Sequence, residues 1–176
     1  MEVFSDGSKY EGYYQDGWKQ GQGKIWFHNG NYYSGELKVN EIDGYGTYVW
    51  PGHKEYTGMW VRNKMHGKGK MTWSEGRVYE GDYFWNQKHG KGEFRWTNGR
   101  RYVGGWKFGK QHGAGKFYSS EGDSRVGEWM EGRRVKWYER DEFEKKKDDE
   151  QNKKRDSERE VINGEENAGE NANEAC

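Results

Sequence analysis

Three histidines and a series of paired glycines are the residues of this chain whose types and spacing could support chemistry. His66, His89 and His112 recur at a 23-residue step, and glycine pairs such as Gly67 and Gly69 follow directly after them. Imidazoles are common zinc ligands, and glycine-rich loops cradle phosphate groups where a helix follows the loop. A metal site and a phosphate-binding loop are therefore the first two hypotheses for these residues.

Neither hypothesis fits the segments that surround these residues. After each glycine pair, polar and apolar residues alternate, as in Gly67, Gly69, Met71 and Trp73, which predicts a strand rather than a helix. If each 23-residue unit advances by about 10 Å, histidines of adjacent units cannot share a metal whose ligands lie about 2 Å from it. The sequence also shows no pairing of a nucleophile with a base. We therefore predict no catalytic residues, no bound metal and no cofactor.

The composition indicates an ordered chain with little material for a deep core. Of 176 residues, 30% are hydrophobic and 17% aromatic, and 28 are glycine. A disordered glycine-rich chain is not expected to carry 10 tryptophans and 13 tyrosines. The formal net charge is zero, with +6 on residues 1–136 and −6 on residues 137–176. A net +6 spread along an extended array is too little to predict binding to nucleic acid.

Cysteine content and hydropathy indicate the cellular compartment in which the protein is expected. Cys176 is the single cysteine, so no disulfide can form within the chain, which suits a reducing environment. No apolar run approaches the roughly 20 residues that a membrane-spanning helix needs, and the first residues lack the apolar core of a signal peptide. We expect a cytoplasmic protein whose contact with membranes is peripheral at most.

A repeat of 23 residues organises residues 1–137. Five copies begin with a tyrosine, a shortened sixth copy begins at Arg125, and a half-copy precedes the first. A fixed period of this length indicates a repeat architecture. The five opening tyrosines are Tyr10, Tyr33, Tyr56, Tyr79 and Tyr102.

Each copy contains two short alternating runs joined by a turn. The first run is aromatic-x-Gly-x-aromatic, as in Tyr56, Gly58 and Trp60, and the second is Gly-x-Gly-x-apolar-x-apolar. Such alternation predicts strands with one buried face. We therefore predict an all-β fold, a single-layer antiparallel meander of β-hairpins in which rings lie across glycines. The turn between the runs is predicted at a position that holds only the two residues most tolerant of a left-handed backbone, namely Gly17, Asn40, Asn63, Asn86, Gly109 and Gly132.

This pattern closely resembles the MORN repeat family (membrane occupation and recognition nexus). Departures from the consensus, such as Leu37 for an aromatic residue and Arg125 for the first tyrosine, cluster near the array ends, where atypical capping repeats are expected. The resemblance implies a stand-alone interaction protein similar to arrays of cytoskeletal assemblies, especially ciliary and flagellar axonemes with their radial-spoke heads. The residues that match the consensus in one copy are Tyr102, Gly104, Trp106, Gly109, His112, Gly113 and Gly115.

The aromatic rows form the predicted partner-binding surface. A single-layer sheet cannot cover this face with its own chain, and exposed apolar grooves mark sites of interaction. We expect a helix or an extended peptide of another protein, or a second copy of this chain, to bind there. An alternative, which can hold at the same time, is that the rings only cover the glycines and each other. The predicted partner-binding residues are Tyr10, Tyr14, Tyr33, Tyr56, Trp60, Tyr79, Tyr83, Tyr102, Trp106 and Trp129.

A second functional hypothesis places anionic phosphoinositides on the opposite face of the strands, as in a peripheral membrane adaptor. Acidic residues such as Glu11 and Asp82 should share that face on adjacent strands, so cross-strand charge pairing is the favoured explanation of its basic residues. The candidate lipid-binding residues are Lys24, Lys68, Lys70, Lys91, Arg95 and Lys116.

The composition changes after Trp137. Residues 138–162 are highly charged, contain no glycine or proline, and place opposite charges four residues apart, as in Glu142 and Lys146. We predict a charged helix there, which either docks on the last hairpin through Trp137, Tyr138 and Phe143 at its start or extends to a partner. Residues 163–176 are predicted to form a disordered acidic tail.

Overall fold

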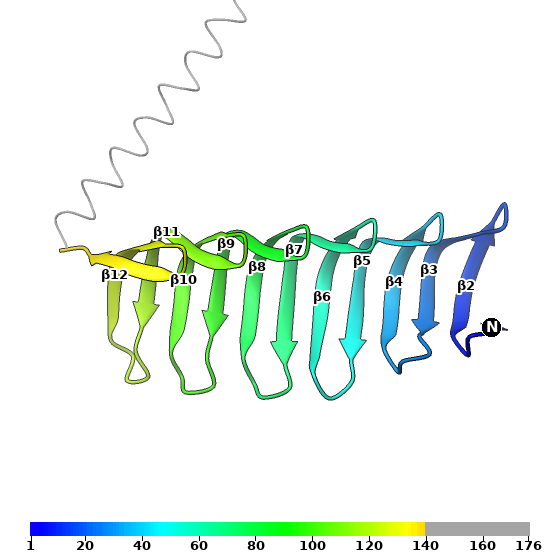
Figure 1. Ribbon diagram of the computed structural model, residues 1–176, viewed down its shortest axis with the longest axis horizontal. Helices are drawn as coiled ribbons and strands as arrows, with labels where there is room; N and C mark the ends of the chain where they lie inside the picture. Colours follow the sequence, from blue (N-terminus) through cyan, green and yellow to red (C-terminus); the bar gives the residue numbers. More distant parts are fainter. Residues whose placement is uncertain (140–176) are drawn as a thin grey trace, which may run out of the picture. The chain divides into compact units, whose positions relative to one another are not determined.

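The computed structural model describes residues 1–139, and its sheet is a one-layer meander (Figure 1). Thirteen strands pair with their sequence neighbours in the order β1 to β13, and every pair is antiparallel. This confirms the predicted fold. Within the described residues no helix is long and apolar enough to cross a bilayer. The compact unit spans Met1–Trp137. Beyond residue 139, the predicted helix and the predicted acidic tail lie outside the described residues.

The strands follow the two runs of each repeat, so the first run forms the even-numbered strands and the second run the odd-numbered ones. The strands are β1 (Glu2–Val3), β2 (Lys9–Gln15), β3 (Trp18–Trp26), β4 (Tyr32–Lys38), β5 (Glu41–Trp50), β6 (Lys54–Val61), β7 (Lys64–Trp73), β8 (Val78–Phe84), β9 (Gln87–Arg95), β10 (Arg101–Lys107), β11 (Lys110–Tyr118), β12 (Ser124–Met130) and β13 (Arg133–Trp137).

A continuous row of glycines crosses the sheet. Each strand from β2 to β12 contributes one glycine, and in the strand register each of these glycines lies opposite the next. The array therefore presents a strip of bare backbone that runs from its second strand to its twelfth. The row consists of Gly12, Gly23, Gly35, Gly46, Gly58, Gly69, Gly81, Gly92, Gly104, Gly115 and Gly127.

The opening tyrosine of each repeat lies across this row on one face. A Cβ built on Gly58 would stand 2.6 Å from the hydroxyl oxygen of Tyr56, and one built on Gly69 would come closer still. Only glycine lets a ring approach the backbone so closely. As a result the five opening tyrosines are 0–1% exposed, although the sheet has a single layer.

The tyrosine hydroxyl also satisfies a backbone group at a β-bulge. The hydroxyl of Tyr56 donates a hydrogen bond to the carbonyl oxygen of Met59 at 2.9 Å, and the other four tyrosines donate to the equivalent carbonyl at 2.8–3.1 Å. The strand register shifts at this point, between Gly58 and Trp60. On the paired strand Gly67 has a φ of +71°, which favours glycine. Because a bulge interrupts the ladder, the hydroxyl replaces a missing partner.

Two further contacts tie the third repeat to the second. The indole N–H of Trp60 donates to the carbonyl of Gly46 at 3.2 Å. At the tight turn, the Asn63 N–H donates to the Ile42 carbonyl at 2.9 Å, and the Asn63 side-chain oxygen accepts from the Ile42 N–H at 2.8 Å. Arg62 and Asn63 have φ values of +46° and +62°, as a type I′ turn requires, which confirms the predicted turn.

The rings themselves interlock along the array. Tyr56 meets Trp60 of its own repeat at 5.0 Å between ring centroids and Tyr83 of the next repeat at 5.1 Å, both edge to face. Tyr79 meets Tyr83 and Trp106 in the same way, at 5.2 Å each. This geometry adds a favourable electrostatic contribution to the burial of each ring. The core of the array is therefore a line of aromatic contacts that joins neighbouring repeats.

We predict that the substitution Gly69→Ala destabilises the array because its methyl group collides with the buried Tyr56 ring. Overpacking of this kind should lower the free energy of unfolding by about 3 kcal/mol. In a Tyr56→Leu background the same substitution should cost less by at least about 1 kcal/mol, because the ring is gone. Urea unfolding of the full chain and its three variants, followed by tryptophan fluorescence, measures this coupling. An equal cost in both backgrounds would contradict the proposed reason for the glycine.

Candidate protein-binding surface

Most of the ten aromatic residues predicted to bind a partner are buried. Besides the opening tyrosines, Trp60 is 4% exposed, Tyr83 5%, Trp106 6% and Trp129 5%, whereas Tyr14 is 46% exposed. The expectation that these rings line an open groove is therefore wrong for nine of the ten. They lie flat over glycines and between rings of neighbouring repeats, so they contribute the core of the sheet and little of its surface. Whether this face binds a partner stays a prediction.

A second row of rings contributes accessible apolar surface to that face. Phe4, Phe27, Trp50, Trp73 and Trp96 recur at the 23-residue step, and each is half-buried and packed against the core. We call these five residues the outer ring row. Two strands separate neighbouring members, which places them about 10 Å apart. Their period is visible in the sequence, since four of them close the second run of a repeat, but the period alone does not show which aromatic position stays exposed.

The outer ring row continues into the core without a gap. The ring centroids of Trp73 and Phe94 lie 5.8 Å apart, those of Phe94 and Trp96 4.7 Å apart, and those of Trp96 and Phe117 6.3 Å apart. Because rigid neighbours hold these rings, a partner would meet a preformed apolar strip and little side-chain entropy would be lost on binding.

Basic side chains are stacked on the rings of this face. The ammonium nitrogen of Lys54 lies 4.7 Å from the Trp50 ring, and the guanidinium of Arg77 lies 5.2 Å from the Trp73 ring. Such placement is favourable because the face of an aromatic ring attracts cations. Arg77 also pairs with Glu75 in the adjoining turn. The basic residues in contact with rings of this face are Lys19, Lys54, Arg77, Lys88, Arg125 and Arg134.

Lys88 is the most enclosed of these cations. Its Nζ lies 4.6 Å from the ring centroids of Phe94 and Trp106, 5.4 Å from that of Tyr79 and 5.8 Å from that of Trp73. Burial among these rings, with a smaller effect from the charge of Arg77, lowers the pKa of Lys88 to about 8.

A hollow of about 270 Å³ opens beside Lys88. Its walls include the rings of Phe94, Trp96 and Trp106, and the Gln111 side chain lies on its β11 side. Rings line the hollow together with the side chains of Lys88, Lys110 and Gln111, so it can accept a side chain that combines an apolar stem with a polar end. Sequence reasoning missed Lys88 because its position in the repeat carries no consistent residue type.

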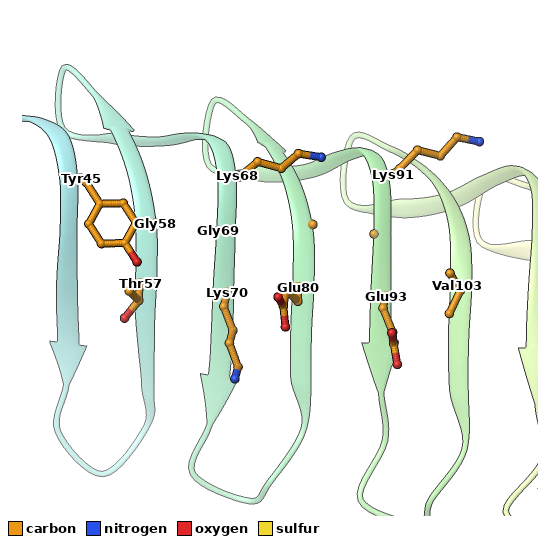
Figure 2. Close-up of a pocket in the computed structure, with 12 residues that line it drawn as sticks. Tyr45, Thr57, Gly58, Lys68, Gly69, Lys70, Glu80, Lys91, Glu93 and Val103 are labelled. Carbon is orange, nitrogen blue, oxygen red and sulfur yellow. The ribbon is translucent and has the colours of Figure 1, made fainter.

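A trough of about 660 Å³ follows the glycine row on the opposite face (Figure 2). Lys68 and Lys91 stand on one side of the trough, and Lys70, Glu80 and Glu93 stand on the other. Three residues of the lipid-binding hypothesis thus share one depression, but carboxylates share it with them.

Acidic neighbours pair with the basic residues of this opposite face. Lys68 lies 2.5 Å from Asp82, and Arg95 lies 2.7 Å from Glu93. Pairs of this kind on exposed strands neutralise the charge that an anionic surface would need. Among the other candidates, Lys24 lies opposite Glu11 and Lys70 opposite Glu80 in the register, and the Lys116 ammonium lies 5.1 Å from the Tyr118 ring.

The recurring histidines pack against exposed rings near the tight turns. His66 lies 5.2 Å from Phe84, and His89 lies 5.5 Å from Phe84 and 5.2 Å from Phe108. Their Nδ1 atoms are buried, with no hydrogen-bond partner in the described part of the chain. Residues 1–139 contain no group of three or more side chains placed to hold a metal ion. His66 and His89 thus contribute to the packing near these turns.

Comparison with solved structures gives a distant match. It is the SAS-4 (dCPAP) TCP domain in complex with a proline-rich motif of Ana2 (dSTIL) from Drosophila melanogaster. The two chains are 13% identical, the match covers 78% of this chain and 88% of that one, and the TM-score is 0.37. A match this loose supports no inference about fold or function. A comparison with curated proteins finds no match.

The repeats themselves match a family model, that of the MORN repeat. Five segments match, namely residues 10–32, 33–53, 56–76, 79–100 and 102–124. Each segment begins with one of the tyrosines that the structure buries over the glycine row. The matched segments make up more than half of the chain, so this protein belongs to the MORN repeat family.

Proposed function

We propose that this MORN repeat protein is a non-catalytic scaffold that binds a segment of another protein along its outer ring row. The observation that carries the proposal is the row itself, because five partly buried rings recur on one face at a fixed step. Aromatic residues are preferred anchors at protein interfaces.

The spacing of the row defines the shape of a suitable partner. An α-helix returns to the same side every seventh residue, after about 10.5 Å, and a polyproline II segment does so every third residue, after about 9.3 Å. Both distances are close to the roughly 10 Å between neighbouring rings. A helix or an extended segment that crosses the strands can therefore place one apolar side chain against each repeat.

We also propose a cytoskeletal location, with a ciliary or flagellar axoneme and a radial-spoke-like setting as the specific case. This part of the proposal has its support in the resemblance of the repeats to stand-alone cytoskeletal arrays. The ring row supports binding to a protein but does not favour one cellular assembly over another.

The phosphoinositide alternative has weaker support. The basic residues that it requires are interleaved with carboxylates on the trough face, and two of them form ion pairs, Lys68 with Asp82 and Arg95 with Glu93. An anionic headgroup would have to compete with these carboxylates for the same cations.

We predict that a photo-crosslinker in place of Trp73 captures a protein partner and that one in place of the adjacent Thr72 does not. The two residues point to opposite faces of β7, so Thr72 is a matched control for expression and proximity. The full chain carrying p-benzoylphenylalanine at either position is irradiated in cells of the source organism, and the adduct is identified by mass spectrometry. The location proposal expects the Trp73 adduct in the detergent-insoluble cytoskeletal fraction and in isolated axonemes.

Equal adducts from both positions, or none from Trp73, would contradict binding at the outer ring row. The substitution Trp73→Ala/Trp96→Ala should abolish the adduct formed from a crosslinker at Trp50. Trp60 and Trp106 are unsuitable for this purpose, because they are buried and their removal would test folding instead.

We also predict little association of the full chain with phosphoinositide-containing vesicles at about 150 mM salt, because paired surface charges are weak and screened. Flotation through a density gradient measures the bound fraction. The variant Lys68→Ala/Lys91→Ala should float as little as the unaltered chain. Strong flotation of the unaltered chain that the variant loses would favour the membrane adaptor instead.

A further inference from the structure

Charge is divided unequally between the two faces of the sheet. Every acidic residue of β2 to β12 is next in sequence to a buried core residue, as Glu80 is to Tyr79 and Glu93 to Phe94. Because neighbouring residues of a strand point to opposite faces, all of these carboxylates belong to the trough face. The ring-bearing face receives basic side chains from the same strands and no acidic ones.

Within the described residues, an acidic side chain of a turn forms an ion pair with one of the stacked cations. Arg77 pairs with Glu75. In the described part of the chain, Lys19, Lys54, Lys88, Arg125 and Arg134 lie near rings and no carboxylate forms an ion pair with any of them.

Of the stacked cations, Lys88 is the one that would bind a carboxylate of a partner most strongly. Its ammonium faces four rings and borders the hollow of about 270 Å³, which Lys110 and Gln111 also line. Lys110 is already engaged with Glu131 at 2.9 Å. Among residues 1–139, Lys88 is thus the cation of the hollow that forms no ion pair. In these surroundings a single ion pair stabilises more than it would in water.

Packing alone does not require a lysine at this position. Repeats two and three place Ile42 and Met65 there, and both pack against the same kind of core. Even a half-buried amine costs free energy relative to these residues unless it finds a partner. The lowered pKa of Lys88 reflects this cost, and a carboxylate beside the amine would raise that pKa again.

We infer that the protein segment bound along the outer ring row is acidic, and that one of its Asp or Glu carboxylates enters the hollow and pairs with Lys88. The inference rests on the proposed function, to which it adds the chemistry of the partner. Apolar side chains of the segment contact the rings at a spacing of one repeat. Carboxylates that lie between these apolar side chains pair with the stacked cations. The complementarity of charge sets the orientation and register of the segment, while the rings supply most of the apolar contact.

The test uses a pair of designed peptides and the full chain. One peptide is a helix of three heptads with leucine at every seventh position and glutamate beside each leucine, and its twin carries glutamine in place of every glutamate. Affinities are measured by fluorescence anisotropy at low ionic strength. The unaltered chain should bind the glutamate peptide at least about tenfold more tightly than the glutamine peptide, as expected for charge-assisted contacts that only the carboxylates can make.

Two lysine variants separate the hollow from the general charge of the protein. Lys88→Met introduces the residue that repeat three has at this position. It should reduce the affinity for the glutamate peptide about tenfold without lowering the urea concentration at the midpoint of unfolding. Lys91→Met removes the same charge from the trough face, and it should change the affinity less than about twofold.

Equal binding of the two peptides, absence of binding by either, or equal effects of Lys88→Met and Lys91→Met would overturn the inference. These outcomes would not by themselves contradict the proposed function. The crosslinker at Trp73 reports independently on whether any protein binds at the outer ring row. A Trp73 adduct with a partner segment that lacks acidic residues would contradict the inference of an acidic partner and would still support the proposed scaffold function.

Discussion

A tyrosine ring lying flat on two facing glycines is the contact on which this structure depends. A single sheet normally needs a second layer to bury its apolar face, yet here the opening tyrosines are 0–1% exposed. The ring of Tyr56 sits where any side chain on Gly58 or Gly69 would collide with it, and its hydroxyl satisfies the bulge carbonyl of Met59. Burial, hydrogen bonding and strand shape are thus met by one side chain per repeat, which is why the unit can be copied along a strip.

This arrangement separates the two tasks of the aromatic residues. Inner rings such as Tyr56 and Trp60 hold the strip together, and outer rings such as Trp73 and Trp96 remain accessible without weakening it. The two faces also differ in charge, since the carboxylates of the strands lie on the trough face and the stacked cations lie beside the rings on the other face. A binding surface therefore arises from the same alternation that builds the strands.

The 23-residue period, the hairpins and the type I′ turns could be predicted from the sequence, because each is a local signal such as the Asn or Gly at Asn63 and Gly109. The exposure of individual rings could not. Tyr56 and Trp73 are both aromatic residues at alternating positions, and only the cross-strand register shows that one lies over glycines while the other lies at the strand end. Lys88 was hidden for a related reason, since its environment is assembled from rings of β7 to β10.

The division into inner and outer rings can be measured directly through the exchange of the indole N–H hydrogens with solvent. In the free protein, the indole N–H groups of Trp60 and Trp106 should exchange slowly, because they donate to the carbonyls of Gly46 and Gly92. Those of Trp73 and Trp96 should exchange rapidly. Slow exchange at all four indoles would contradict an accessible outer ring row, and rapid exchange at all four would contradict the buried core beneath it.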